Sequence, residues 1–278
     1  MPDSIQIETG TDELLCEITQ RVAVVTLNKP DKKNALGDVL TPALRQILID
    51  LEMRSDVGCV MLTGAGNAFC SGGDVSEMGG APRKVLSQEE RIADLATKQQ
   101  TLTGRLYHLT KPTIAALPGA AAGAGFSIAL ACDIRVASSR AFMITAFRNV
   151  GLSGDYGASW FLPRLVGLSR AKSLFFQSPR IDAEEGRNIG LIDQVYPEKS
   201  FREDALAFAI EIANGPTEAL TRMKHNLHAG LSQTLDESLL LEAKQMIASG
   251  VGEEAREAIT AFKEKRKPIF FPPAVDKG

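Results

Sequence analysis

The sequence lacks several features that mark common classes of protein. Its 31 lysines and arginines are outnumbered by 34 aspartates and glutamates, so it has no basic excess of the kind that nucleic-acid-binding surfaces need. No apolar run approaches the length that spans a membrane, and the opening MPDSIQIETGTDELL has neither the basic start nor the apolar stretch of a secretion signal. We therefore expect a protein of the reducing cytoplasm, with neither nucleic acid nor a membrane among its partners.

Cysteine and histidine are too few and too scattered to predict a metal site. The four cysteines lie far apart without CxxC spacing, which favours buried free thiols: Cys16, Cys59, Cys70 and Cys132. His108 precedes a predicted strand, whereas His225 and His228 lie in a late helical segment, and none has the spacing of metal ligands. We therefore expect no bound metal.

Alternating strand and helix patterns predict an α/β core. Two β-branched apolar runs over residues 14–19 and 22–27 are split by Gln20 and Arg21, which predicts a hairpin. Apolar residues at helical spacing between 40 and 51 then precede a strand-like run from residue 57. The alternation continues with a helix over 89–108, a strand over 113–117, a helix over 126–131 and a strand over 134–137.

The C-terminal part follows a different pattern. From residue 201 onward the apolar spacing is helical throughout, so we predict a core over 1–200 and a helical subdomain over 201–278. Its apolar stripes exceed what one small subdomain can easily hide, which favours an oligomer. Within the core, residues 76–91 mix glycine, proline and charge, which predicts a mobile surface loop. This loop is either a lid or ordinary solvated chain.

Two stretches place small residues between a strand and a helix: AFCSGGDV over 68–75 and LPGAAAGAGFSIALACD over 117–133. Glycine and alanine let the main chain approach a ligand closely, and the free amides of a helix's first turn stabilise an anion or a developing oxyanion. The alternative is that the small residues only let a helix pack tightly on a sheet. Neither stretch fits the dinucleotide-binding or phosphate-loop pattern.

These stretches, with VAVVTLNKPDKKNAL, FLPRLVG and AEEGRNIGLIDQVYP, resemble successive signatures of the crotonase (enoyl-CoA hydratase/isomerase) superfamily, in the family's order. The resemblance covers about residues 22–197 and resumes at TAFKEKRKP near the C-terminus. It implies an α/β fold of repeated ββα units in a superhelix, with a C-terminal helical subdomain that mediates oligomerisation. It also implies an acyl-CoA enzyme that forms a homotrimer or homohexamer.

The resemblance carries over to particular positions. The backbone amides of Gly73 and Ala124 correspond to the family's oxyanion hole, which holds the thioester carbonyl oxygen. The positions that correspond to contacts with the coenzyme A moiety, the last two near its adenine and phosphate end, are Lys32, Lys33, Ser71, Asp74, Phe262 and Lys265. No cofactor beyond the coenzyme A moiety of the substrate is implied.

The catalytic carboxylates set this chain apart from the family's hydratases. Hydratases resemble one another in carrying two glutamates that activate water, and here Ser127 and Phe147 occupy those positions. VGLSGDYGASWFLPRLVG instead places Asp155 where several family isomerases have their acid/base, among them the ring-opening isomerase of phenylacetyl-CoA breakdown. Apolar neighbours would desolvate this carboxylate and raise its pKa. Alternatively, Asp155 caps the following helix.

The resemblance implies enoyl-CoA double-bond isomerisation through a thioester enolate, with Asp155 as the acid/base. The alternatives are enoyl-CoA hydration or acyl-CoA hydrolysis, a covalent aspartyl intermediate as in related dehalogenases, and a non-catalytic homologue that binds acyl-CoA or RNA.

We predict that turnover of acyl-CoA esters is unchanged by exhaustive dialysis against EDTA, because the expected chemistry takes place on the thioester itself. Turnover is measured before and after dialysis. Activity that disappears and is restored by one added metal ion contradicts this prediction.

Overall fold

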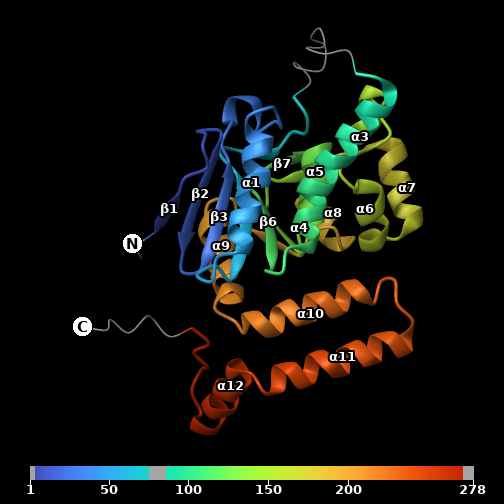
Figure 1. The fold of residues 1–278 in the computed structure, drawn as a ribbon. Coiled ribbons are helices and arrows are strands. Elements are labelled where there is room, and N and C mark those ends of the chain that lie inside the picture. Colours follow the sequence, from blue (N-terminus) through green and yellow to red (C-terminus); the bar gives the residue numbers. More distant parts are fainter. Residues whose placement is uncertain (1–3, 75–85, 272–278) are drawn as a thin grey trace.

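The computed structural model describes residues 4–74 and 86–271, and its core is a seven-stranded sheet (Figure 1). The first three strands pair antiparallel and the remaining ones parallel. In spatial order the strands are β1 (Ile5–Ile7), β2 (Leu14–Thr19), β3 (Val22–Leu27), β4 (Cys59–Gly64), β6 (Thr113–Leu117), β8 (Ile134–Ser138) and β11 (Gln194–Tyr196). The predicted hairpin is confirmed, with Gln20 and Arg21 both at positive φ in its turn.

A second sheet of four short strands runs beside the first. Its spatial order is β10 (Ile181–Asp182), β9 (Phe142–Ile144), β7 (Ala120–Ala122) and β5 (Ala68–Cys70). Strands β5 and β7 are parallel, with Ala68 opposite Ala120 and Cys70 opposite Ala121. Strand β5 begins the first glycine-rich stretch, and β7 lies within the second. Their parallel pairing therefore places the two stretches side by side, with the glycines that follow each strand at the same end of the sheet.

Helices cover both faces of the larger sheet. In chain order, all helices of the described residues are η1 (Pro30–Lys32), α1 (Leu40–Glu52), α3 (Gln88–Gln99), the π-helical turn η2 (Gln100–Gly104), α4 (Arg105–His108), α5 (Ala124–Ala131), η3 (Phe147–Val150), α6 (Ala158–Val166), α7 (Leu168–Gln177), α8 (Ala183–Asn188), α9 (Phe201–Ala213), α10 (Thr217–Ala229), α11 (Leu235–Gly250) and α12 (Glu253–Glu264). Among the described residues, no helix has the length and apolar character needed to cross a membrane.

The core has two apolar layers, one on each face of the larger sheet. On one face, the buried stripe of α1 packs under β2 and β3 together with α5. On the other face, Phe201, Ala205 and Ala209 of α9 pack on Val22 and Met61. Small alanines on α9 let the helix lie close to the strands. The part of the tail that lies apart from the sheet in Figure 1 therefore begins at α10.

Residues 76–91, predicted as a loop and possible lid, lie partly outside the described residues. At the described end of this segment the loop prediction is wrong, because α3 begins at Gln88. Ser87 accepts a hydrogen bond from the Glu90 amide, and the Glu90 carboxylate accepts one from the Ser87 amide. This capping box offsets the lack of apolar periodicity in the helix's first turn.

The helices α10 to α12 bury little within one chain. Neither α10 nor α11 contains a fully buried side chain. Apolar side chains that stay more than half exposed on the three helices are Met223, Leu227, Leu235, Leu239, Leu240, Met246, Ile247, Ile259 and Phe262. Such a continuous apolar surface is unusual for a monomer.

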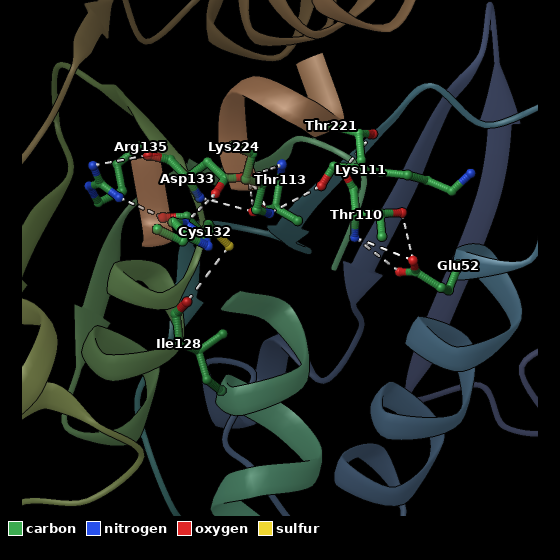
Figure 2. Close-up of polar contacts among 11 residues, drawn as sticks. Glu52, Thr110, Lys111, Thr113, Ile128, Cys132, Asp133, Arg135, Thr221 and Lys224 are labelled. Carbon is green, nitrogen blue, oxygen red and sulfur yellow. Dashed lines mark hydrogen bonds and ion pairs between the residues drawn. The ribbon is translucent and has the colours of Figure 1, made fainter. Parts of the chain in front are cut away.

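Polar contacts fasten α10 to the end of the sheet (Figure 2). The Lys224 ammonium lies 2.7 Å from a carboxylate oxygen of Asp133 and donates to the carbonyl of Lys111. The same Asp133 oxygen accepts hydrogen bonds from the amide and the hydroxyl of Thr113. The Thr221 hydroxyl donates to the carbonyl of Thr110. These contacts fix the position of α10 against the core.

Asn34 locks the loop that follows β3. Its side chain is fully buried, and its amide nitrogen donates to the carbonyls of Ala65 and Ala68 at 3.0 and 2.8 Å. Its side-chain oxygen accepts from the Lys29 amide at 2.9 Å. One residue thus joins the η1 segment to the chain that leads into β5.

We predict that Asn34→Ala lowers the free energy of unfolding by about 3 kcal/mol, because it leaves buried backbone groups without partners. Equilibrium unfolding in urea measures the change. Asn149→Ala is the matched control, since Asn149 is exposed and should change stability by less than about 0.5 kcal/mol. Equal effects of the two substitutions contradict the role of Asn34.

Candidate active site

The two glycine-rich stretches meet backbone to backbone. Gly72 has φ +98° and Gly123 has φ +53°, conformations that side chains disfavour. A Cβ atom built on Gly72 would lie 3.0 Å from the carbonyl oxygen of Ala122 and 3.3 Å from the amide nitrogen of Ala124. Only glycine permits this approach.

Each stretch presents a backbone amide with no protein acceptor within the described part of the chain. Leu36 donates to the carbonyl of Gly72 at 2.8 Å and accepts from Asp74 at 3.0 Å, which leaves the Gly73 amide between them unused. Ala124 is the first residue of α5, so its amide has no partner in the preceding turn. The structure therefore brings the two predicted amides together at the N-terminal end of α5, where the helix dipole is positive.

The tight-packing interpretation of the small residues also holds at one position. A Cβ atom on Gly125 would lie 2.2 Å from the carbonyl oxygen of Cys70. Gly125 thus lets α5 press against β5, and this contact fixes where the Ala124 amide lies. Packing and amide presentation are two results of the same small residues.

Four of the predicted coenzyme A contacts cluster beside the first stretch. The Lys32 ammonium lies 2.7 Å from a carboxylate oxygen of Asp74. Ser71 donates its amide to the Lys33 carbonyl at 3.0 Å and its hydroxyl to the Lys32 carbonyl at 3.2 Å. Lys29, which the sequence analysis missed, lies 3.8 Å from the same Asp74 oxygen. The cluster joins the loop after β3 to the Gly73 turn.

The remaining two predicted contacts lie elsewhere in this chain. Phe262 is 84% exposed near the end of α12, and Lys265 is the residue that terminates this helix. In Figure 1, α12 lies beyond α10 and on the opposite side of it from the core sheet. A single chain thus does not bring Phe262 and Lys265 to the paired amides.

Ser127 ties Asp155 to the second amide. The fully buried Ser127 hydroxyl donates to the main-chain carbonyl of Asp155 at 2.9 Å, and it lies 3.3 Å from the Gly123 carbonyl. It therefore contacts both the turn that presents Ala124 and the segment that carries Asp155. The residue that stands where hydratases have a glutamate acts here as a brace.

The Asp155 side chain is half-buried, and one of its two carboxylate oxygens is fully buried. Helix α6 has Gly157 as its N-cap and receives no side-chain capping hydrogen bond, so the helix-cap interpretation of Asp155 is wrong. The Oδ1 atom is buried, and within the described residues it has no hydrogen-bond partner. Burial raises the pKa of Asp155 to about 6. Such a carboxyl can both accept and return a proton near neutrality.

By the family resemblance, Phe147 occupies the position of the second hydratase glutamate. Phe147 is buried and stacks on Phe175, with 6.1 Å between ring centroids. A Cβ atom on Gly154, the residue before Asp155, would lie 3.2 Å from the Phe175 ring. The rings thus stand against the backbone beside Asp155 and keep this side of the segment apolar.

Comparisons with known proteins agree with this geometry. The enoyl-CoA hydratase/isomerase family model matches residues 17–272. The chain is 37% identical over 254 residues to the Rhodobacter capsulatus protein named "Probable enoyl-CoA hydratase", covering 91% of this chain and 96% of the relative. It is 34% identical over 262 residues to 1,2-epoxyphenylacetyl-CoA isomerase of Escherichia coli, covering 92% and 97%.

Solved structures agree as well. The crystal structure of enoyl-CoA hydratase from Bacillus anthracis superposes with a TM-score of 0.86 at 30% identity, covering 93% of this chain and 98% of that one. The chain belongs to the enoyl-CoA hydratase/isomerase family and has the crotonase fold. It is therefore an acyl-CoA enzyme of that family.

We predict that the Asp155 carboxyl titrates near pH 6, about two units above an ordinary aspartate, because no partner offsets its desolvation. The carboxyl signal that disappears in Asp155→Asn is followed against pH by ¹³C NMR of carboxyl-labelled protein. A midpoint near pH 4 contradicts the buried environment.

Proposed function

We propose that the enzyme shifts the double bond of enoyl-CoA esters, with Asp155 as the acid/base. The single observation that carries this proposal is the Asp155 carboxyl, whose Oδ1 atom is buried and has no hydrogen-bond partner within the described residues. Ser127 links the main chain of Asp155 to the turn of the Ala124 amide. Burying a carboxyl without a partner is unfavourable for folding, and such groups concentrate at functional sites.

The proposed reaction begins with the thioester carbonyl oxygen between the amides of Gly73 and Ala124. The Asp155 carboxylate removes a proton from the α- or γ-carbon, and the electron pair moves into the thioester as an enolate whose oxygen the two amides stabilise. The protonated Asp155 then returns the proton at the other end of the conjugated system. No atom is gained or lost, and the double bond has moved.

The presence of Ser127 and Phe147 at the positions of the two hydratase glutamates favours isomerisation over hydration. Adding water calls for groups that position and activate it, and Ser127 and Phe147 supply neither a second carboxylate nor a charge. The relatives include both an isomerase and proteins named as hydratases, so hydration, or hydrolysis of the thioester, is the second candidate. Incorporation of ¹⁸O from labelled water into the product distinguishes these reactions from isomerisation.

The rest of the proposed site needs an assembly. We propose that Lys32, Lys33, Ser71 and Asp74 contact the coenzyme A moiety, and that Phe262 and Lys265 reach it from a neighbouring subunit of a homotrimer or homohexamer. The exposed apolar faces of α10 to α12 support this assembly. No further cofactor enters the proposal, and the four buried free thiols suit a reducing cytoplasm.

We predict that Asp155→Asn lowers kcat for isomerisation by roughly 10²–10⁴-fold and leaves the Kd for the ester within about threefold, because it removes the base but not the amides. Steady-state kinetics and exchange of solvent deuterium into the acyl group measure the loss.

Asp50→Asn is the matched control, since Asp50 is exposed on α1 and contacts Gln46. It should retain full activity. A folded Asp155→Asn enzyme that isomerises at the unmutated rate contradicts the proposed role of Asp155.

A further inference from the structure

A cavity of about 1020 Å³ lies between α4, α6 and α10. Gly157, two positions after Asp155 in the sequence, is one of its lining residues. Thr103 lines it from η2, which packs against α5. The lining therefore includes residues of the segment that follows Asp155 and of the turn that packs against the helix of the Ala124 amide.

Aromatic rings form one wall of this cavity. Tyr107 meets Trp160 edge to face with centroids 5.0 Å apart, and Trp160 meets Phe161 in the same way. A Cβ atom on Gly157 would lie 2.7 Å from the Phe161 ring, so this wall reaches back to the segment of Asp155. Trp160 is 38% exposed, so its ring lines the cavity instead of being buried in the core. Such a wall suits hydrocarbon.

The rest of the lining is rich in cationic and basic groups. All three histidines of the chain line the cavity, His108 from α4 and His225 and His228 from α10, together with Arg164, Arg222 and Lys224. Aspartate and glutamate are absent from the lining residues within the described part of the chain. The charged side chains of the lining are therefore all cationic, which favours an anion over a cation as ligand.

Pairing differs among these groups. Lys224 is paired with Asp133, and Arg222 lies 3.2 Å from Glu218. Arg164 instead lies over the Trp160 ring, 3.8 Å from its centroid, and donates to the Trp160 carbonyl at 2.9 Å. Among the ion pairs of the described residues, none involves Arg164. Its guanidinium therefore has donors left for a ligand.

His228 completes this end of the cavity. Its ring stacks on Tyr107 with centroids 3.9 Å apart. Burial, with a further contribution from the charge of Lys224, lowers the pKa of His228. The stacked pair places a polar nitrogen at the edge of an aromatic surface, next to the cations of α10.

We propose that this cavity receives the far end of the substrate's acyl group, and that this end carries a carboxylate bound by Arg164. The proposal rests on the proposed function, because it assumes that the thioester lies at the amides of Gly73 and Ala124. Apolar carbons of the acyl group then pass the rings of Phe161 and Trp160. The terminal carboxylate meets a guanidinium, the side chain best suited to bind it.

The test compares pairs of acyl-CoA esters that are matched in chain length and end in either a carboxylate or a methyl group. Turnover is measured with the enoyl esters, and Kd is measured by calorimetry with the saturated esters. We expect the native enzyme to prefer the carboxylate ester at one chain length. Arg164→Gln should reduce this preference about tenfold, as expected for the loss of a charged hydrogen bond, and should leave the methyl ester unaffected.

Arg148→Gln is the matched control, since Arg148 is also exposed and also donates to a backbone carbonyl, that of Gln177. It should leave the preference unchanged, and Arg164→Lys should restore part of it. A native enzyme that prefers the methyl ester in both turnover and Kd overturns the proposal. So does a preference that Arg164→Gln leaves intact, whatever its effect on subunit assembly.

Failure of the proposed function gives a different result. If neither enoyl ester is isomerised, the proposed function fails, and the Kd values of the saturated esters still decide whether the cavity prefers a carboxylate. If the methyl ester alone is isomerised, with no difference in Kd, the proposed function stands and the cavity proposal is wrong.

Discussion

The close approach of two backbone turns is the constraint on which the rest of the structure depends. The turns at Gly72 and Gly123 come within contact distance because Gly72 has no side chain that would meet the Ala122 carbonyl, while Gly123 adopts a positive φ that other residues disfavour. The parallel pairing of β5 with β7 holds them there, and Gly125 presses α5 onto β5. Hydrogen-bond donors are therefore in place before a substrate arrives, so no reorganisation is needed when charge develops on an oxygen.

From this contact the position of Asp155 follows. Ser127 lies one turn into the helix that Ala124 begins, and its hydroxyl reaches the main chain of Asp155. The aromatic pair of Phe147 and Phe175 then closes the neighbouring side of the segment. A carboxyl in such surroundings lowers stability when ionised, yet its raised pKa is what proton transfer near neutrality needs.

Local patterns predicted the longer elements well and the contacts between them poorly. The hairpin of β2 and β3 has the predicted bounds, because β-branched runs with a two-residue break specify it locally. Strands β5 and β7 have only three residues each, too few to show alternation, so the sequence pattern does not separate them from the two glycine-rich stretches. The cavity beside α10 could not be predicted, because His108 of α4 and the two histidines of α10 are brought together only by tertiary packing. The family motifs supplied the positions of Gly73, Ala124 and Asp155, whereas only the structure shows that Asp155 does not cap α6.

The central claim is that the amides of Gly73 and Ala124 bind the thioester carbonyl oxygen. Infrared difference spectroscopy of a saturated acyl-CoA ester, labelled with ¹³C at the thioester carbonyl and bound to the enzyme, tests this claim most directly. Two hydrogen bonds from preorganised amides polarise the carbonyl, so its stretching frequency should fall below the value in water. A bound ester whose carbonyl absorbs at the same frequency as the free ester in water would contradict the account.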